Sequence, residues 1–119
     1  MTTNWTPDFT LVHMGINADC AEEAKTVAEA YAALFAMNTR QTSISYFAGN
    51  IIEVMSGNGR GTHGHIAIGT HDMESAIAGL RAKGVEFIEE TVVKNAEGKY
   101  GAVYLKEEVG GFAIHLIPA

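Results

Sequence analysis

Two histidines of this 119-residue chain stand inside short apolar segments that resemble each other. His13 lies in the segment 11–17 and His65 in the segment 64–70, and each segment is followed by an acidic residue in a helix-start setting, Asp19 or Asp72. A weak repeat of this kind predicts a small fold built from two copies of one supersecondary unit. If the copies pair, the two imidazoles come together, so both histidines are candidate site residues.

The last apolar segment of each copy adds a second polar residue. Glu53 is central in the segment 50–55, and His115 is central in the segment 112–117. A carboxylate in the middle of an apolar strand is costly to bury unless it is paired or bound to a metal. Each copy therefore offers one polar residue from its first strand and one from its last.

Three imidazoles and one carboxylate form a suitable ligand set for a divalent metal ion. We expect His13, Glu53, His65 and His115 to hold Zn²⁺, Ni²⁺, Mn²⁺, Co²⁺ or Fe²⁺. An octahedral ion would leave two positions for water or a bidentate substrate, whereas a tetrahedral zinc site would be closed and structural. The sequence leaves the coordination number and the identity of the metal open.

The alternative for each of these residues, taken singly, is a structural role. One histidine on a strand is more often hydrogen-bonded or exposed than a ligand, and Glu53 alone could face solvent on an edge strand. The coincidence of four such residues at matched places favours a binding site over a structural explanation.

Other residues with reactive side chains give weaker signals. We expect His63 at the rim of the site and His71 exposed beside a helix start. Cys20 stands where a helix dipole could lower a thiol pKa, but no base partner is evident, and a buried structural thiol is the favoured interpretation. Three tyrosines could line a pocket, although packing is the simpler role: Tyr46, Tyr100 and Tyr104.

The first copy covers about residues 9–56. A strand at 11–18 leads to a helix at 20–35, for which Asp19 is the expected N-cap and Glu22 the third residue of a capping box. Helical spacing places Tyr31, Leu34 and Phe35 toward the core. Strands are expected at 39–42, 43–48 and 51–55, with Gly49-Asn50 as a tight hairpin turn.

The second copy covers about residues 63–118 and repeats this order. A strand at 65–69 leads to a helix at 73–83, with Asp72 as its N-cap and Gly84 as its C-cap. Strands follow at 85–93, 102–106 and 112–117. The glycine-rich segment 56–62 is interpreted as a linker rather than a phosphate loop, because the Lys-Ser/Thr pair of that motif is missing.

The order β-α-β-β-β, present twice, predicts an α+β fold with a curved, cup-shaped mixed sheet in a single domain, residues 1–119. Hydrophobic residues make up 47% of the chain and charged residues 18%, which is typical of a folded protein. A formal charge of −6, with scattered basic residues, disfavours nucleic acid and anionic membranes as partners. One cysteine, no long apolar run and no signal-peptide pattern lead us to expect a cytoplasmic protein.

At these residues the chain resembles the vicinal oxygen chelate superfamily, which contains glyoxalase I, fosfomycin-resistance proteins, extradiol dioxygenases and methylmalonyl-CoA epimerase. The resemblance covers about residues 9–118, and its most specific points are 11–13, 51–54, 64–67 and 112–117. In glyoxalase I-like members the corresponding positions hold metal ligands in the order His, Glu, His, Glu. His13, Glu53 and His65 match this order, while His115 stands where a carboxylate is expected.

The resemblance implies a small metal-dependent lyase or isomerase that acts on a 2-oxo or vicinal-dioxygen substrate through a metal-stabilised enediolate. Glu53 or His115 would then exchange protons with the substrate. It also implies a homodimer, in which the two copies pair within one chain or across two. The rival hypotheses are a non-catalytic protein that sequesters a small molecule in the same cup, and a structural domain with vestigial ligands.

Overall fold

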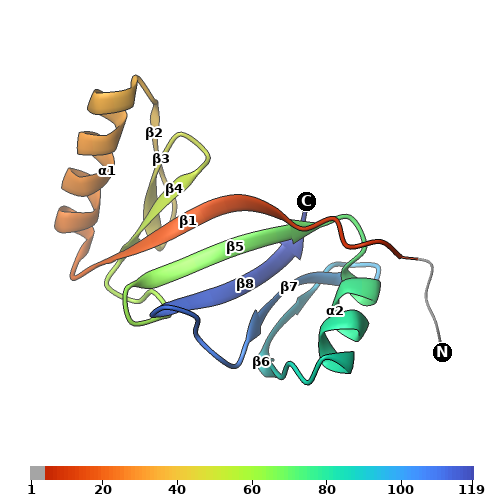
Figure 1. Ribbon diagram of the computed structural model, residues 1–119. Helices are drawn as coiled ribbons and strands as arrows, with labels where there is room; N and C mark the ends of the chain where they lie inside the picture. The colour runs from red at the N-terminus through yellow and green to blue at the C-terminus, as the bar shows by residue number, and fades with distance from the viewer. Residues whose placement is uncertain (1–4) are drawn as a thin grey trace.

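A computed structural model describes residues 5–119, which form one open, curved sheet of eight strands with two helices (Figure 1). The elements are β1 (Thr10–Ala18), α1 (Ala21–Phe35), β2 (Thr39–Gln41), β3 (Ser45–Ala48), β4 (Ile52–Ser56), β5 (Gly64–Thr70), α2 (Met73–Ala82), β6 (Phe87–Lys94), β7 (Tyr100–Leu105) and β8 (Phe112–Pro118). The predicted α+β class and the repeated β-α-β-β-β order are therefore confirmed. No helix in the described range is long and apolar enough to span a bilayer.

The two copies join inside one chain. The strand order is β2-β3-β4-β1-β5-β8-β7-β6, so the first strands of the copies, β1 and β5, lie side by side and antiparallel. Each also pairs in parallel with the last strand of its own copy, β1 with β4 and β5 with β8. The four strands that carry the predicted site residues are thus the four central strands of the sheet.

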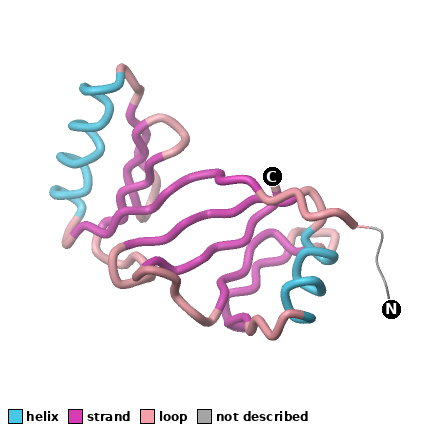
Figure 2. Tube along the Cα trace, in the orientation of Figure 1, coloured by secondary structure: helices cyan, strands magenta, loops and turns pink. Residues whose placement is uncertain are grey.

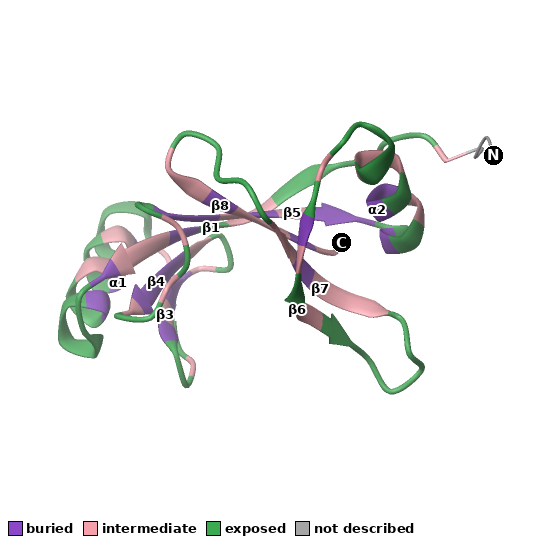
Figure 3. Cartoon of the chain, turned by 90° about the horizontal axis from the view of Figure 1, so that it is seen from below, coloured by how far each residue is buried: buried purple, intermediate pink, exposed green. Residues whose placement is uncertain are grey.

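Both helices pack on one face of the sheet, and the candidate site lies on the other face. Helix α1 packs on Ala18 and Val54, while α2 packs on Val103 and Leu116. These strand residues alternate with the predicted site residues and point to the opposite side. The helices lie toward the two ends of the curved sheet, and their buried positions face the strands (Figure 3).

Helix α1 contacts the sheet through small residues rather than large ones. Its buried residues, Ala24, Ala28 and Ala32, form a stripe at four-residue spacing. Leu34 and Phe35 are instead 74% and 62% exposed, so their predicted core positions are wrong. Leu34 is two positions past Ala32, about 200° around the helix, and therefore faces solvent.

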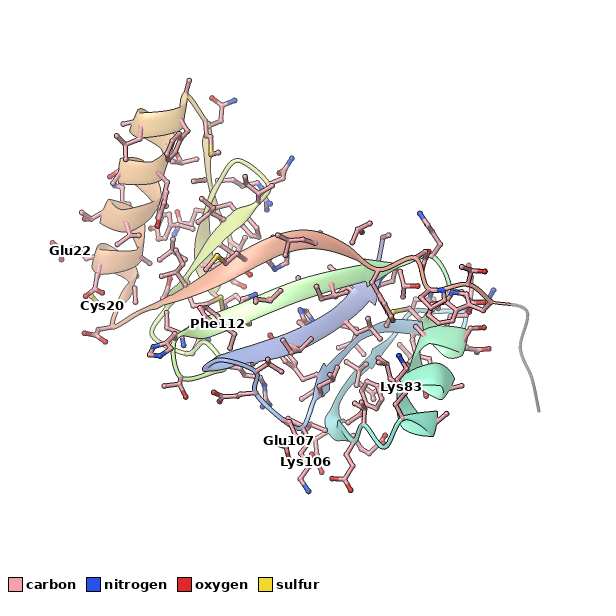
Figure 4. All side chains as sticks on the ribbon, in the orientation of Figure 1. Cys20, Glu22, Lys83, Lys106, Glu107 and Phe112 are labelled. Atoms are coloured by element: carbon pink, nitrogen blue, oxygen red, sulfur yellow. The ribbon has the colours of Figure 1, made fainter. Side chains whose placement is uncertain are left out.

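The start of α1 also differs from the prediction. The N-cap is Cys20, not Asp19, and it makes no side-chain capping hydrogen bond in the described structure. Cys20 is exposed at this helix end (Figure 4), which corrects the expectation of a buried thiol.

The second helix, α2, follows its prediction more closely. Asp72 accepts a hydrogen bond from the Ser75 amide, and Gly84 lies one residue beyond the C-cap Lys83.

The hairpin between β3 and β4 has one more residue in its turn than predicted. Three residues, 49–51, connect the strands, so Phe47 pairs with Glu53 and Ser45 with Met55. A two-residue turn at Gly49-Asn50 would have shifted the register by one and placed the other face of β3 beside Glu53. This difference decides which side chains accompany the carboxylate.

A bulge in β1 changes the face of its first residues. Leu11 pairs with Ile68 and His13 with Ala67, so Val12 is the extra residue. Leu11 therefore leaves the face on which His13, Gly15 and Asn17 lie, contrary to the simple alternation predicted from the sequence.

Candidate metal centre

The register of the central strands brings the four predicted residues onto one face. Gly15 of β1 pairs with Glu53 on one side and with His65 on the other. One step along, Ala67 of β5 pairs with both His13 and His115. Residues directly opposite each other share a face of the sheet, so the set converges on the side away from the helices.

Three atoms meet closely in this set. Nε2 of His13 and Nε2 of His65 lie 3.2 Å apart, and Glu53 Oε1 lies 3.3 Å and 3.2 Å from them, respectively. We call His13, Glu53 and His65 the ligand trio. Glu53 is 9% exposed and His65 is 2% exposed, so the trio lies largely out of bulk water.

The second carboxylate oxygen of Glu53 is fixed by a hydrogen bond from the neighbouring strand. The Ser45 hydroxyl donates a 2.7 Å hydrogen bond to Glu53 Oε2, and Thr42 Oγ1 lies 2.7 Å from Ser45 Oγ. Ser45 is itself 1% exposed. These two hydrogen bonds fix the rotation of the carboxylate and direct Oε1 toward the two imidazoles.

These contacts keep Glu53 ionised. Burial opposes its charged form, but hydrogen bonds with His13, His65 and Ser45 outweigh burial and hold the pKa of the carboxyl well below its usual range. The trio therefore contains a fixed anion at neutral pH, which favours a divalent cation.

His115 is held differently. Its ring stacks on Tyr104, with ring centroids 4.3 Å apart and planes 7° from parallel. Burial, followed by the nearby His65 and His13, lowers the pKa of His115 to about 4, so the imidazole is neutral at pH 7. Its Nδ1 is buried and has no hydrogen-bond partner within residues 5–119. Tyr104, next to it, has a raised phenol pKa because of burial and the charge of Glu53.

Gly15 makes room for one of the rings. A Cβ at this position would lie 2.0 Å from Cε1 of His65, which is far inside contact distance. The His65 ring therefore lies over the bare backbone of the neighbouring strand. A glycine is needed here for close approach and not for its dihedral freedom.

The donors fit a divalent metal ion. Ligand atoms about 2.0–2.2 Å from one ion, at angles of about 90–109°, are separated by about 2.8–3.6 Å. The three separations in the trio fall in this range. Ligand nitrogens of His13, His65 and His115 also lie within 4.8 Å of one another, which places His115 at the edge of the same cluster.

The remaining predicted residues lie outside this cluster. His63 is in the loop before β5, exposed, with its ring 6.0 Å from that of Phe112. His71 is exposed, and its amide donates to Asp8. Tyr46 packs near α1 and Tyr100 near α2, in agreement with structural roles.

Sequence reasoning missed the residues that support the trio. Ser45 and Thr42 give no signal in the sequence, because a serine beside Glu53 follows only from the three-residue turn. Gly15 shares the predicted face of His13, yet its contact with the His65 ring depends on the β1–β5 register. Tyr104 was a candidate pocket residue, and it lies directly beside His115.

Solved structures with similar folds support this architecture. Methylmalonyl-CoA epimerase from Mycobacterium tuberculosis superposes with a TM-score of 0.64 at 20% identity, covering 92% of this chain and 87% of that one. Hypothetical protein BH1468 from Bacillus halodurans C-125 gives 0.63 at 19% identity, covering 95% and 96%. The chain has the glyoxalase-like fold. A variant of Streptomyces coelicolor methylmalonyl-CoA epimerase, in complex with 2-nitronate-propionyl-CoA, gives 0.58 at 19% identity, covering 92% and 94%.

At these identities the comparison with solved structures establishes the fold. No protein-family model and no curated protein matches the sequence. A fold alone does not define a function, which depends on the residues of the site.

Proposed function

We propose that this protein is a metal-dependent isomerase or lyase that acts on a small 2-oxo or vicinal-dioxygen substrate. The observation that carries the proposal is the approach of Glu53 Oε1 and two imidazole Nε2 atoms to within 3.2–3.3 Å of one another. They meet on the open face of a fold that methylmalonyl-CoA epimerases also have.

In this proposal the ligand trio holds the ion, and the ion would stabilise negative charge on substrate oxygens as a Lewis acid. Both oxygens of Glu53 are committed, one to Ser45 and one to the imidazoles, so Glu53 is a fixed ligand rather than a base.

Proton exchange then falls to His115. Its imidazole is neutral at pH 7, and its buried Nδ1 has no partner in the described structure. It would take the proton from the carbon next to the substrate carbonyl while the electron pair moves onto the carbonyl oxygen. Return of that proton to the same or the neighbouring carbon completes an epimerisation or isomerisation.

Solvent exchange tests this assignment. In D₂O, metal-loaded protein should catalyse exchange of the hydrogen beside the carbonyl in at least one member of a panel. The panel contains 2-oxo acids, the hemithioacetal of methylglyoxal and a methylmalonyl thioester, and exchange is followed by proton NMR. Changing His115→Gln should abolish exchange while substrate still binds. Binding without exchange by the unaltered protein would instead support a sequestering protein.

We also propose a homodimer, although the four site residues come from one chain. On the face of β1 and β5 that points away from the ligand trio, several apolar side chains are exposed or half-buried, including Leu11, Met14 and Ile66. A second copy of the chain would cover them. Light scattering coupled to size-exclusion chromatography should give twice the mass of one chain. The mass of a monomer would contradict this proposal.

A further inference from the structure

A small pocket adjoins the candidate metal centre on the β7–β8 side. It has a volume of about 230 Å³ and is lined by Arg60, Gly61, Ile88, Tyr104, Leu105, Lys106, Glu108 and Ala113. Two of these residues are strand neighbours of site histidines, because Tyr104 pairs with His115 and Ala113 pairs with His65. The pocket therefore borders the strand positions next to the candidate centre.

The loop between β4 and β5 supplies one wall of this pocket. The Asn17 side-chain amide donates to the carbonyl oxygen of Gly61 at 2.8 Å, and the His63 amide donates to that of Gly111 at 2.9 Å. A Cβ on Gly61 would lie 2.8 Å from the Ala113 nitrogen, so the loop rests directly on β8. Figure 2 shows this loop beside the loop that leads into β8. The segment interpreted as a linker is thus part of the site's surroundings.

Arg60 is the cation that this loop presents. Its guanidinium carbon lies 5.2 Å from the centroid of the Tyr104 ring, the same ring that stacks on His115. Among residues 5–119, Arg60 has no carboxylate within ion-pair distance. Its charge is therefore available to a ligand.

The other charges of the pocket are already engaged. Lys106, at the end of β7 (Figure 4), pairs with Glu86 at 3.1 Å. Glu108 accepts hydrogen bonds from the amide and the hydroxyl of Thr62. The unpaired guanidinium favours an anion, and the nearby Glu108 carboxylate disfavours a doubly charged one. A planar carboxylate matches both the single charge and the fork of Arg60.

We infer that this pocket binds a carboxylate at the far end of the substrate, through Arg60, and so selects dicarboxylic 2-oxo compounds. The inference rests on the proposed function, since it assumes that the reacting carbonyl lies at the ligand trio. Because two pocket residues are strand neighbours of His65 and His115, a short dicarboxylic compound is the substrate expected to reach both places.

Two five-carbon probes that differ in one group test this inference. 2-Oxoglutarate carries the distal carboxylate and 2-oxopentanoate has a methyl group instead. In NMR titrations, the unaltered protein should bind 2-oxoglutarate at least about tenfold tighter, in keeping with a charged, bidentate contact. Arg60→Met should remove this preference and Arg60→Lys should restore part of it. The exposed, paired Arg81→Met is the matched control and should keep the preference.

Titrations with and without Ni²⁺ separate this inference from the proposed function. If the metal centre fails, Ni²⁺ will not strengthen binding of either probe, yet the preference that depends on Arg60 will persist. If the pocket inference fails, the two probes will bind equally to the unaltered protein, or the Arg60→Met protein will retain the full preference.

Discussion

Glu53 of the ligand trio and His115 of the β7–β8 flank, defined as Tyr104 and His115, occupy matched positions of the repeat but are held differently. The trio is crowded, with atoms 3.2–3.3 Å apart and a carboxylate held by Ser45. On the flank, the His115 ring stacks on Tyr104 and makes an edge contact with His65, and its Nδ1 is unpartnered in the described structure. In the proposed function this difference assigns ion binding to the trio and contact with the substrate to the flank.

Removal of the trio's charge should have the largest effect. Glu53→Gln should weaken Zn²⁺ or Ni²⁺ binding by more than about 100-fold, since even changes beyond the ligands cost 10–100-fold. His115→Gln should weaken it by less than about tenfold, because His115 is proposed as an acid–base group. Competition with a chromophoric chelator measures both, with the exposed Glu97→Gln as control. Equal losses at both positions would erase the distinction between trio and flank.

The support behind Glu53 should matter next. Ser45→Ala removes the hydrogen bond to Oε2 and should weaken metal binding by about 10–100-fold with little change in fold. Ser43→Ala is the matched control, because Ser43 is exposed two positions away. An unchanged affinity in Ser45→Ala would show that the carboxylate holds its orientation without the serine.

The glycine beneath His65 offers a steric test. Gly15→Ala puts a Cβ 2.0 Å from the imidazole, so the ring must move, and the free energy of unfolding should fall by about 1–3 kcal/mol. Metal affinity should fall with it. Gly101→Ala is the control, since a Cβ there meets its nearest neighbour at 3.4 Å. Chemical denaturation measures this change. If Gly15→Ala has the same free energy of unfolding as the unaltered chain, the packing described for the trio is contradicted.

A further test concerns pH and the flank. The pKa of His115 is about 4 in the folded chain against an ordinary 6.5, so between these values the unfolded chain binds the proton more readily. Acidification from pH 6.5 to 4 should therefore lower the free energy of unfolding of the metal-free protein, with a slope of up to about 1.4 kcal/mol per pH unit from this group. Glu53, whose pKa is depressed, adds loss of stability only below its ordinary 4.5.

Denaturation of metal-free protein at several pH values measures this slope. His115→Asn should flatten it between pH 6.5 and 4.5, whereas the exposed His71→Asn should leave it close to that of the unaltered chain. A slope unaffected by His115→Asn would show that the flank does not keep its imidazole neutral.

The fold and the four candidate site residues could be predicted from the sequence because both predictions depend on strong local signals. Alternating apolar segments and matched polar residues locate His13, Glu53, His65 and His115 before any register is known. The residues that contact the trio, such as Ser45, depend on the strand register. One extra turn residue at 49–51 decides whether Ser45 or Tyr46 lies on the face of Glu53.

Other errors have similar physical origins. Helical spacing alone did not show that α1 would use its alanines to approach the sheet and leave Leu34 and Phe35 in solvent. The bulge at Val12 likewise broke an alternation that held for the rest of β1. Long-range pairing, rather than local propensity, determines these details.

Titration with Co²⁺, followed by its visible spectrum, tests the central claim most directly. We expect saturation at one ion per chain, with the weak absorption of a site that has more than four ligands and retains open positions. The Glu53→Gln protein should not saturate in the same range. Failure of the unaltered protein to bind Co²⁺ stoichiometrically, or an identical titration by Glu53→Gln, would contradict the account of the ligand trio as a metal centre.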